Sequence, residues 1–173
     1  VGRGAHANAE RGLCFMEMVA WFEGEAHSDE PECACPVLGA YGIRLNDNMN
    51  DQQRNALLRP LVPLMAGTRD AASEQKRAEF LAMWAVNKVL PVILRERGHE
   101  ELALNCQTAS NLDAAYAAAY AAAEAADAAY EIWSIAVEGL RQAILIGRHD
   151  GFSVAANTLV ERHTALKQLA CAV

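Results

Sequence analysis

The chain has 173 residues, of which 53% are hydrophobic and 21% are charged, and its formal net charge is −7. This composition excludes a disordered chain, and the acidic balance without a long basic run argues against nucleic acid as a partner, because non-specific nucleic-acid binding needs a basic surface. No apolar stretch reaches the roughly 18–20 uninterrupted residues of a membrane span. The length fits one domain with its own hydrophobic core.

The N-terminal part is predicted to form two helices joined by a polar loop. Asn8 is expected to cap the first helix, which continues through the apolar segment LCFMEMVAWF at 13–22 and ends at Gly24. A helix that is apolar on nearly every side is a buried helix. Pro36 suits the first position of a second helix, which ends in the polar segment at 46–51.

The middle of the chain is predicted to be helical with proline interruptions. A third helix starts at Asn50 or Asp51, and the prolines within 59–68 limit that segment to a turn and a short helical piece. Ser73 is expected to cap a fourth helix, whose apolar positions have the 3.6-residue period, and Pro91 is expected to kink it.

The last part is predicted to contain an alanine-rich helix and a final helix. Helical propensity extends over 111–147, which allows one helix of about 35 residues bent at Gly139, and Asp150 opens the last helix. No segment shows the alternation of a strand. The sequence therefore predicts an all-α, single-domain bundle of five to seven helices, with Cys-bearing helices and loops in 1–70 and a long-helix bundle in 71–173.

The segment GEAHSDEPECACPVLG at 24–39 is the clearest candidate for chemistry, because it joins two cysteines to several acidic residues. A carboxylate at Glu17 stands in the middle of the apolar first helix, where burial costs several kcal/mol unless the group is paired, protonated or metal-bound. Cys14 lies three residues earlier, on the same helical face as Glu17. Clustered cysteines in a reducing, cytoplasmic setting are more often metal-binding or reactive than disulfide-bonded.

One interpretation is a zinc-type site, since thiolates, imidazole and carboxylate in a set of four suit this cation. The predicted ligands are Cys14, Cys33 and Cys35, with a fourth from Glu17, His27 or Asp29. A single C-x-C pair is less specific than paired C-x-x-C knuckles, and no second pair exists.

Two other interpretations remain open at this point. In the first, Cys14 is a small core residue, Glu17 pairs with Arg44 or Arg59, and the loop is ordinary acidic surface. In the second, Cys35 is a reactive thiol, because it directly precedes a helix whose positive end lowers a thiol pKa, although the neighbouring glutamates oppose this.

The stretch from Leu13 to Arg69 resembles a family of bacterial proteins without an assigned activity. The matching segments are LCFMEMV, GEAHSDEPECACPVL, RLNDNMND and LLRPLVPLMAGTR. The resemblance implies that Trp commonly replaces His27, which weakens His27 as a ligand. It also implies that some relatives carry His in place of Cys35, an exchange that a metal ligand tolerates.

The alanine-rich segment carries a stripe of tyrosines and acids at helical spacing. Its small side chains let a neighbouring helix approach closely, but the stripe also suits a ligand groove or the contact face of a homodimer. The residues of this predicted ligand or interface face are Tyr116, Tyr120, Glu124, Asp127 and Tyr130.

These features support three functional hypotheses. The leading one is a helical accessory protein that acts by binding another protein or a small apolar molecule, with a metal-stabilised or cysteine-lined site. The second is a small enzyme that uses Glu17 as general base or Cys35 as reactive thiol. The third is a homodimeric interaction module that uses the alanine and tyrosine helix. Neither nucleic acid nor a membrane is expected as a partner.

Overall fold

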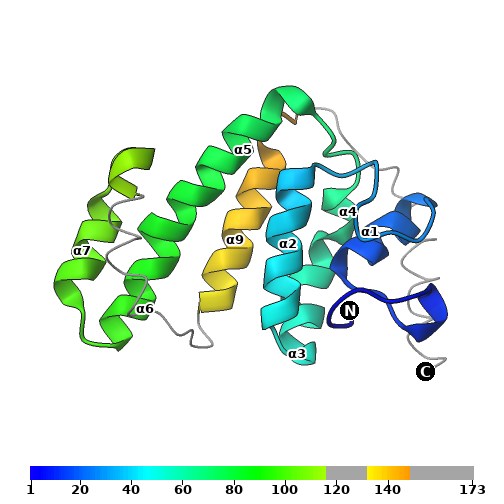
Figure 1. Cartoon of the computed structure of the whole chain (residues 1–173), viewed down its shortest axis with the longest axis horizontal. Coiled ribbons are helices and arrows are strands. Elements are labelled where there is room, and N and C mark those ends of the chain that lie inside the picture. The colour runs from blue at the N-terminus through cyan, green and yellow to red at the C-terminus, as the bar shows by residue number, and fades with distance from the viewer. Residues whose placement is uncertain (116–131, 149–173) are drawn as a thin grey trace.

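A computed structural model of the chain describes residues 1–115 and 132–148, and these residues form helices and connecting turns without any strand (Figure 1). The prediction of an all-α bundle is therefore confirmed. Within the same two ranges, no helix combines the length and the apolar character that crossing a membrane would require.

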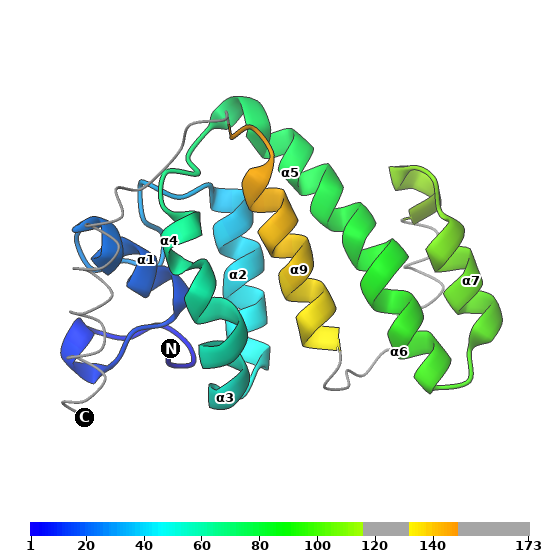
Figure 2. The ribbon, with the colours of Figure 1, turned by 180° about the vertical axis from the view of Figure 1, so that it is seen from behind.

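The α-helices are joined by short turns, and two of them continue through a wider turn into the next element. Their bounds are α1 (Phe15–Glu23), α2 (Pro36–Asn48), α3 (Asp51–Gln53), α4 (Val62–Met65), α5 (Ala71–Trp84), α6 (Leu90–Glu96), α7 (Glu100–Thr108) and α9 (Ile132–Leu145). Helix α2 packs against α1, α5 and α9, and α4 packs against α1 (Figure 2). Helices α6 and α7 pack against each other at the end of the molecule away from α1 (Figure 1).

The first helix is shorter than the sequence predicts. Asn8 caps only a single 3₁₀ turn, Ala9–Arg11, and Gly12 then turns the chain with a φ of 121°. Because this left-handed region favours glycine, the backbone cannot continue as a helix there, and α1 begins only after Cys14. The predicted start at Asn8 was wrong, whereas the predicted end is confirmed, since Gly24 closes α1 with a φ of 77°.

The next two helix starts agree with the prediction because both are set by local chemistry. Pro36 occupies the first position of α2, where its missing N–H costs nothing. Asn50 caps α3 in a reciprocal capping box: its Oδ1 accepts from the Gln53 N–H at 2.9 Å, and Gln53 Oε1 accepts from the Asn50 N–H at 2.8 Å.

The predicted turn and short helical piece within 59–68 are confirmed as a 3₁₀ turn, Arg59–Leu61, and α4, and two prolines of the chain follow π turns. The π turns Arg54–Leu58 and Ala85–Val89 immediately precede the segments that contain Pro60 and Pro91. A proline removes the N–H that would bind the carbonyl four residues earlier, and a wider turn relieves this conflict. The second turn joins α5 to α6, so the chain stays helical from Ala71 to Glu96.

The cap predicted for α5 was wrong by three residues. Asp70 is the N-cap, and its Oδ1 accepts from the Ala72 N–H at 3.1 Å. Ser73 lies in the first turn of the helix and donates its hydroxyl to Asp70. Aspartate and serine are both strong capping residues, so the sequence alone did not decide between them.

The end of the predicted long helix is seen in α9, which continues through Gly139. A Cβ atom at Gly139 would lie 2.4 Å from Trp84 Cδ1, and the Trp84 indole donates to the Ile135 carbonyl at 2.9 Å. Glycine therefore lets α5 and α9 cross closely. The predicted tyrosine and acid face and the predicted helix after Asp150 lie outside the described residues.

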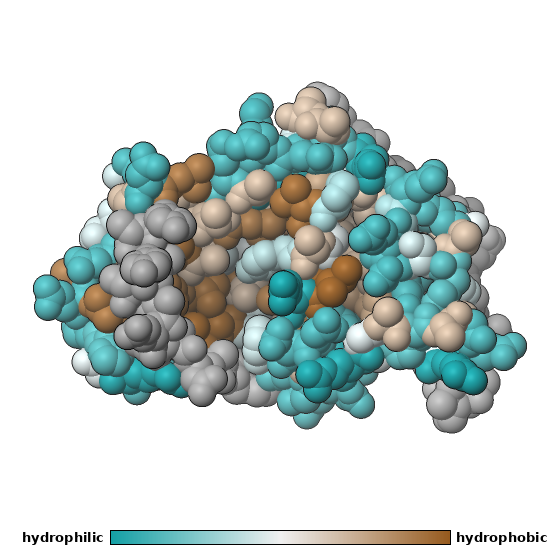
Figure 3. Space-filling view, in the orientation of Figure 1, coloured by the Kyte–Doolittle hydropathy of each residue, from teal (hydrophilic) through white to brown (hydrophobic). Residues whose placement is uncertain are grey.

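The core has a large and a small cluster. The large cluster is centred on α1, α2, α4 and α9 and contains Phe15, Phe22, Leu38, Met65 and Leu140, all at most 2% exposed. A smaller cluster lies between α6 and α7. In Figure 3, apolar side chains gather over α5 and α9 in a hollow near the middle of the face, and hydrophilic side chains cover much of its surroundings.

Candidate functional site

Glu17 is a buried carboxylate at the start of α1, where only 2% of the residue is exposed. It forms a capping box with Cys14: Glu17 Oε2 accepts from the Cys14 N–H at 2.6 Å, and Cys14 Sγ accepts from the Glu17 N–H at 3.5 Å. The carboxylate therefore satisfies N–H groups that the helix leaves without internal partners.

Two histidines complete the surroundings of this carboxylate. His6 donates its backbone N–H to Glu17 Oε1 at 2.6 Å, and His6 Nδ1 lies 2.9 Å from Oε2. His27 Nε2 lies 3.4 Å from Oε1 and 2.7 Å from the His6 carbonyl oxygen. The expected pairing of Glu17 with Arg44 or Arg59 was therefore wrong. Its partners are His6 of the N-terminal segment and His27 of the acidic loop, which joins α1 to α2.

The pKa of Glu17 is set by these contacts. Burial raises the pKa of this carboxyl, but the hydrogen bonds from His6 and Cys14 outweigh burial and hold the pKa below its ordinary value. A base whose oxygens are already occupied by donors has no free lone pair directed at a substrate. We conclude that Glu17 anchors the N-terminal segment and the acidic loop to α1.

The three N-terminal cysteines serve separate local roles. Cys14 is the N-cap of α1, and Cys35 is the N-cap residue of α2 and is 0% exposed. Cys33 lies in the loop between these helices and donates its backbone N–H to Glu25 Oε1 at 2.8 Å. In the part of the chain that the structure describes, no three His, Cys, Asp or Glu side chains are placed to hold a metal ion. Zinc binding stays a prediction of the sequence.

The thiol pKa values disfavour an activated cysteine at two of these positions. Burial raises the pKa of Cys14 to about 12, and burial together with the hydrogen bond and charge of Glu25 raises the pKa of Cys33 to about 12. Cys35 is enclosed in the core, where a substrate does not reach its sulfur. Thiolate, the nucleophilic form, is therefore scarce at Cys14 and Cys33.

This arrangement predicts slow alkylation of Cys33, the half-buried member of the group. At pH 8 we expect iodoacetamide to modify Cys33 about a hundredfold more slowly in the folded chain than in the same chain unfolded in denaturant, because little thiolate is present. Peptide mass spectrometry after timed quenching measures the rate at each cysteine. Equal rates in the folded and unfolded chains would contradict this assignment.

The acidic loop between α1 and α2 is held by its own glutamate and by the turn after α4. Glu25 accepts from the backbone N–H groups of Glu32 at 2.7 Å and Cys33 at 2.8 Å. Thr68 Oγ1 accepts from the Cys35 N–H at 3.0 Å, and the Arg69 N–H donates to the Cys33 carbonyl at 3.1 Å. The loop backbone is therefore fixed at several points without help from its other carboxylates.

A cleft of about 450 Å³ lies between this loop and the first turns of α2. We call it the acidic cleft. Its apolar lining comes from both elements and from α1. Its lining also includes three acidic residues and one arginine, which are exposed or half-buried and which we call its rim. The lining residues are Met16, Asp29, Glu30, Pro31, Glu32, Ala34, Cys35, Pro36, Gly39, Ala40, Ile43 and Arg69. Asp29 and Cys35, both predicted as site residues, thus border the same cleft, but Cys35 is 0% exposed and its sulfur stays in the core.

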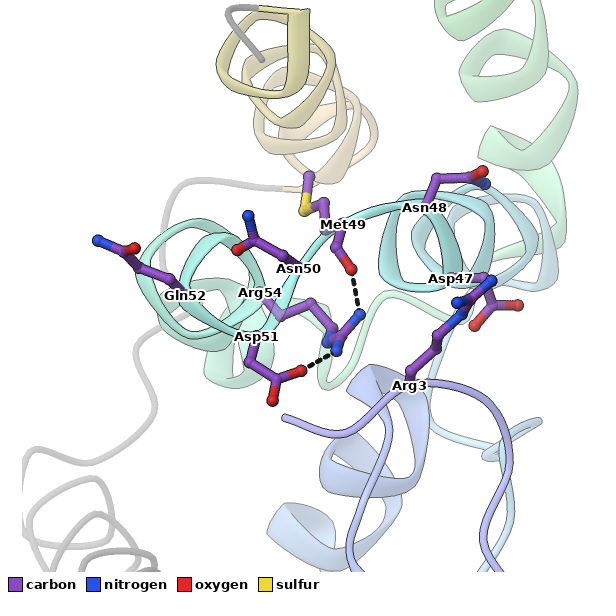
Figure 4. A pocket seen from close by; sticks show the side chains of 8 residues that line it. All are labelled: Arg3, Asp47, Asn48, Met49, Asn50, Asp51, Gln52 and Arg54. Carbon is purple, nitrogen blue, oxygen red and sulfur yellow. Dashed lines mark hydrogen bonds and ion pairs between the residues drawn. The ribbon is translucent and has the colours of Figure 1, made fainter. Parts of the chain in front are cut away.

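A wider hollow of about 860 Å³ lies beside α3, and Figure 4 shows its lining residues. Its central charges are used within the protein: Arg54 donates to the carboxylate of Asp51 and to the carbonyls of Met49 and Asn46. Asp47 accepts from the Gly4 N–H at 3.2 Å. The hollow is open and polar, so it would bury little of a ligand, and the acidic cleft is the better candidate.

No family model, curated protein or solved structure matches the chain. The resemblance to a bacterial family stays a prediction, and the site is argued from its own chemistry.

The sequence did not point to three residues that shape this region: His6, Glu25 and Arg69. The glycines on both sides of His6 were a signal in the sequence that its ring is closely packed. A Cβ at Gly2 would lie 2.7 Å from the His6 ring, and one at Gly12 would lie 3.0 Å away. Arg69 reaches the loop only through the tertiary fold, 34 residues along the chain from Cys35.

Proposed function

We propose that the chain is a binding protein and that the acidic cleft is its binding site. The observation that carries the proposal is a cleft of about 450 Å³ with an apolar floor and a rim of charged groups. Small-molecule sites are concave, largely apolar and marked by a few polar groups, with volumes of roughly 300–1,000 Å³. A reducing, cytoplasmic setting accords with the free thiols of Cys14, Cys33, Cys35 and Cys106.

The surroundings of the two residues that were predicted to be catalytic favour binding over catalysis. Glu17 is enclosed by its hydrogen-bond donors, and the Cys35 sulfur is in the core. General bases and nucleophiles need to reach a reacting atom, at hydrogen-bond distance or through one water. The cleft instead presents surface carboxylates and aliphatic side chains, which bind and orient a ligand.

The experiment is an NMR titration of the ¹⁵N-labelled full chain with three fragments: cyclohexanol, cyclohexylamine and cyclohexanecarboxylate. We expect at least one of them to shift amide resonances of residues 29–43, and these shifts to saturate. The fragments share one apolar body, so the test does not depend on the charge of the ligand. If none of the three fragments causes a localised, saturable shift, the proposal is rejected.

Two variants make this test specific to the cleft. Ala40 is an exposed lining residue, so Ala40→Trp fills the cleft from its rim without entering the core. Lys76→Trp places the same side chain on the exposed face of α5, outside the cleft. We expect the first variant to abolish the shifts and the second to retain them. If both variants kept the shifts, the fragments would bind outside the acidic cleft.

A further inference from the structure

We infer that the acidic cleft takes a small organic cation, an ammonium or guanidinium group carried on an apolar body. This inference rests on the proposed binding site and specifies its ligand class. It comes from the charges of the rim, the apolar character of the floor and the fixed backbone between them.

The rim has an excess of negative charge, and the ion pairs of residues 1–115 and 132–148 leave it uncompensated. Asp29, Glu30 and Glu32 line the cleft together with one cation, Arg69, so its charged residues carry three negative charges and one positive charge. Among the described residues, the ion pairs involve other groups, and none includes these three carboxylates. A concave site lined by one sign of charge raises the local concentration of the opposite ion. The cleft therefore favours a cation.

The three carboxylates are also not needed to hold the loop. Glu25 performs that role by accepting from two loop N–H groups, and the Arg69 guanidinium approaches the Ala34 carbonyl at 3.5 Å instead of a carboxylate. Carboxylates that do not hold the loop are free to accept hydrogen bonds from a ligand. Charge-assisted hydrogen bonds of this kind are stronger than neutral ones.

The apolar floor of the cleft favours a cation that carries an apolar body. Met16 of α1 closes the base of the cleft against Gly39 of α2, since a Cβ at Gly39 would come within 3.3 Å of Met16 Cε. Above this base, the half-buried Ile43 lines the cleft, and Ala40 lies at its exposed edge. A hydrated inorganic ion would gain nothing from this surface, whereas an aliphatic amine buries carbon against it.

The test compares the affinities of cyclohexylamine, cyclohexanol and cyclohexanecarboxylate in the NMR titration of the full chain. At low salt we expect cyclohexylamine to bind about tenfold more tightly than cyclohexanol, because several exposed charge pairs together contribute about that factor. We expect cyclohexanecarboxylate to bind more weakly than cyclohexanol. If cyclohexanol binds in the cleft as tightly as the amine, the inference is overturned while the binding site stands. If none of the three binds, both are overturned.

Charge variants assign the preference to the rim. In the triple variant Asp29→Asn, Glu30→Gln and Glu32→Gln, we expect the amine to lose its tenfold advantage and cyclohexanol to keep its affinity. A matched triple variant, Glu10→Gln, Glu96→Gln and Glu101→Gln, removes the same charge from positions outside the cleft. The amine should keep its advantage there within about twofold, since distant exposed charges are screened. Equal losses in both triple variants would mean that net charge, and not the cleft, selects the cation.

Discussion

Replacing Glu17 with alanine is expected to lower the free energy of unfolding by about 3–5 kcal/mol, because removing one partner of a buried charged network leaves the others unpaired. The N–H groups of His6 and Cys14 donate to this carboxylate, each at 2.6 Å, and Glu17 is 2% exposed. Urea denaturation followed by circular dichroism measures the change. Glu10→Ala, which removes an exposed acid of the same segment, should change the free energy of unfolding by less than about 0.5 kcal/mol.

The same carboxylate predicts a pH dependence of stability. The pKa of Glu17 is lower in the folded chain than in the unfolded chain, because hydrogen bonds from His6 and Cys14 overcome the effect of burial. Its contribution is therefore present above the unfolded pKa and is lost as the pH falls through the folded pKa. In Glu17→Gln this part of the acid dependence should disappear. An alanine variant as stable as the wild type would show that the network is not needed for folding.

Replacing Arg77 with alanine is expected to destabilise the chain by about 3–5 kcal/mol, through lost packing and unsatisfied carbonyl groups. Arg77 is 1% exposed and is the largest fully buried side chain among the described residues. Its guanidinium donates to the Ile146 carbonyl at 2.7 and 3.1 Å and to the Thr68 carbonyl at 2.6 Å. It thus joins α5 to the end of α9 and to the turn that supports the acidic loop.

A matched variant on the same helix separates this role from a general effect of charge. Lys76 is the exposed neighbour of Arg77, and Lys76→Ala should be nearly neutral in the same denaturation measurement. Arg77→Lys should recover only part of the loss, because an ammonium lacks the planar fork that reaches two carbonyls at once. If lysine restored full stability, the charge alone, and not the directed hydrogen bonds, would be what Arg77 supplies.

The helix boundaries that the sequence predicted correctly depend on local chemistry. Pro36, Asn50 and Gly24 each begin or end a helix through their own backbone or a capping bond to a residue close in sequence. The predicted start of α1 was wrong because Gly12 adopts a positive φ, which many glycines do not. A local pattern shows that a turn is permitted there, but not that it occurs.

The partners within the site could be predicted less well, because they come from distant segments. The apolar neighbours of Glu17 correctly indicated a buried carboxylate, but its partner His6 lies outside α1 and reaches it around Gly12. Likewise Cys33 and Cys35 are separated by a single residue, yet Cys33 lies in the loop and Cys35 occupies the N-cap position of α2. Spacing in sequence does not determine whether sulfurs converge, since that depends on how the helices pack.

The most direct test of the central claim is a crystal structure of the full chain grown with cyclohexylamine. We predict that its ring lies against Ile43, beside Ala40, and that its nitrogen lies about 2.7–3.0 Å from a carboxylate oxygen of Asp29, Glu30 or Glu32. Density for the amine at another place on the protein, with the cleft holding only water at saturating amine, would contradict the account.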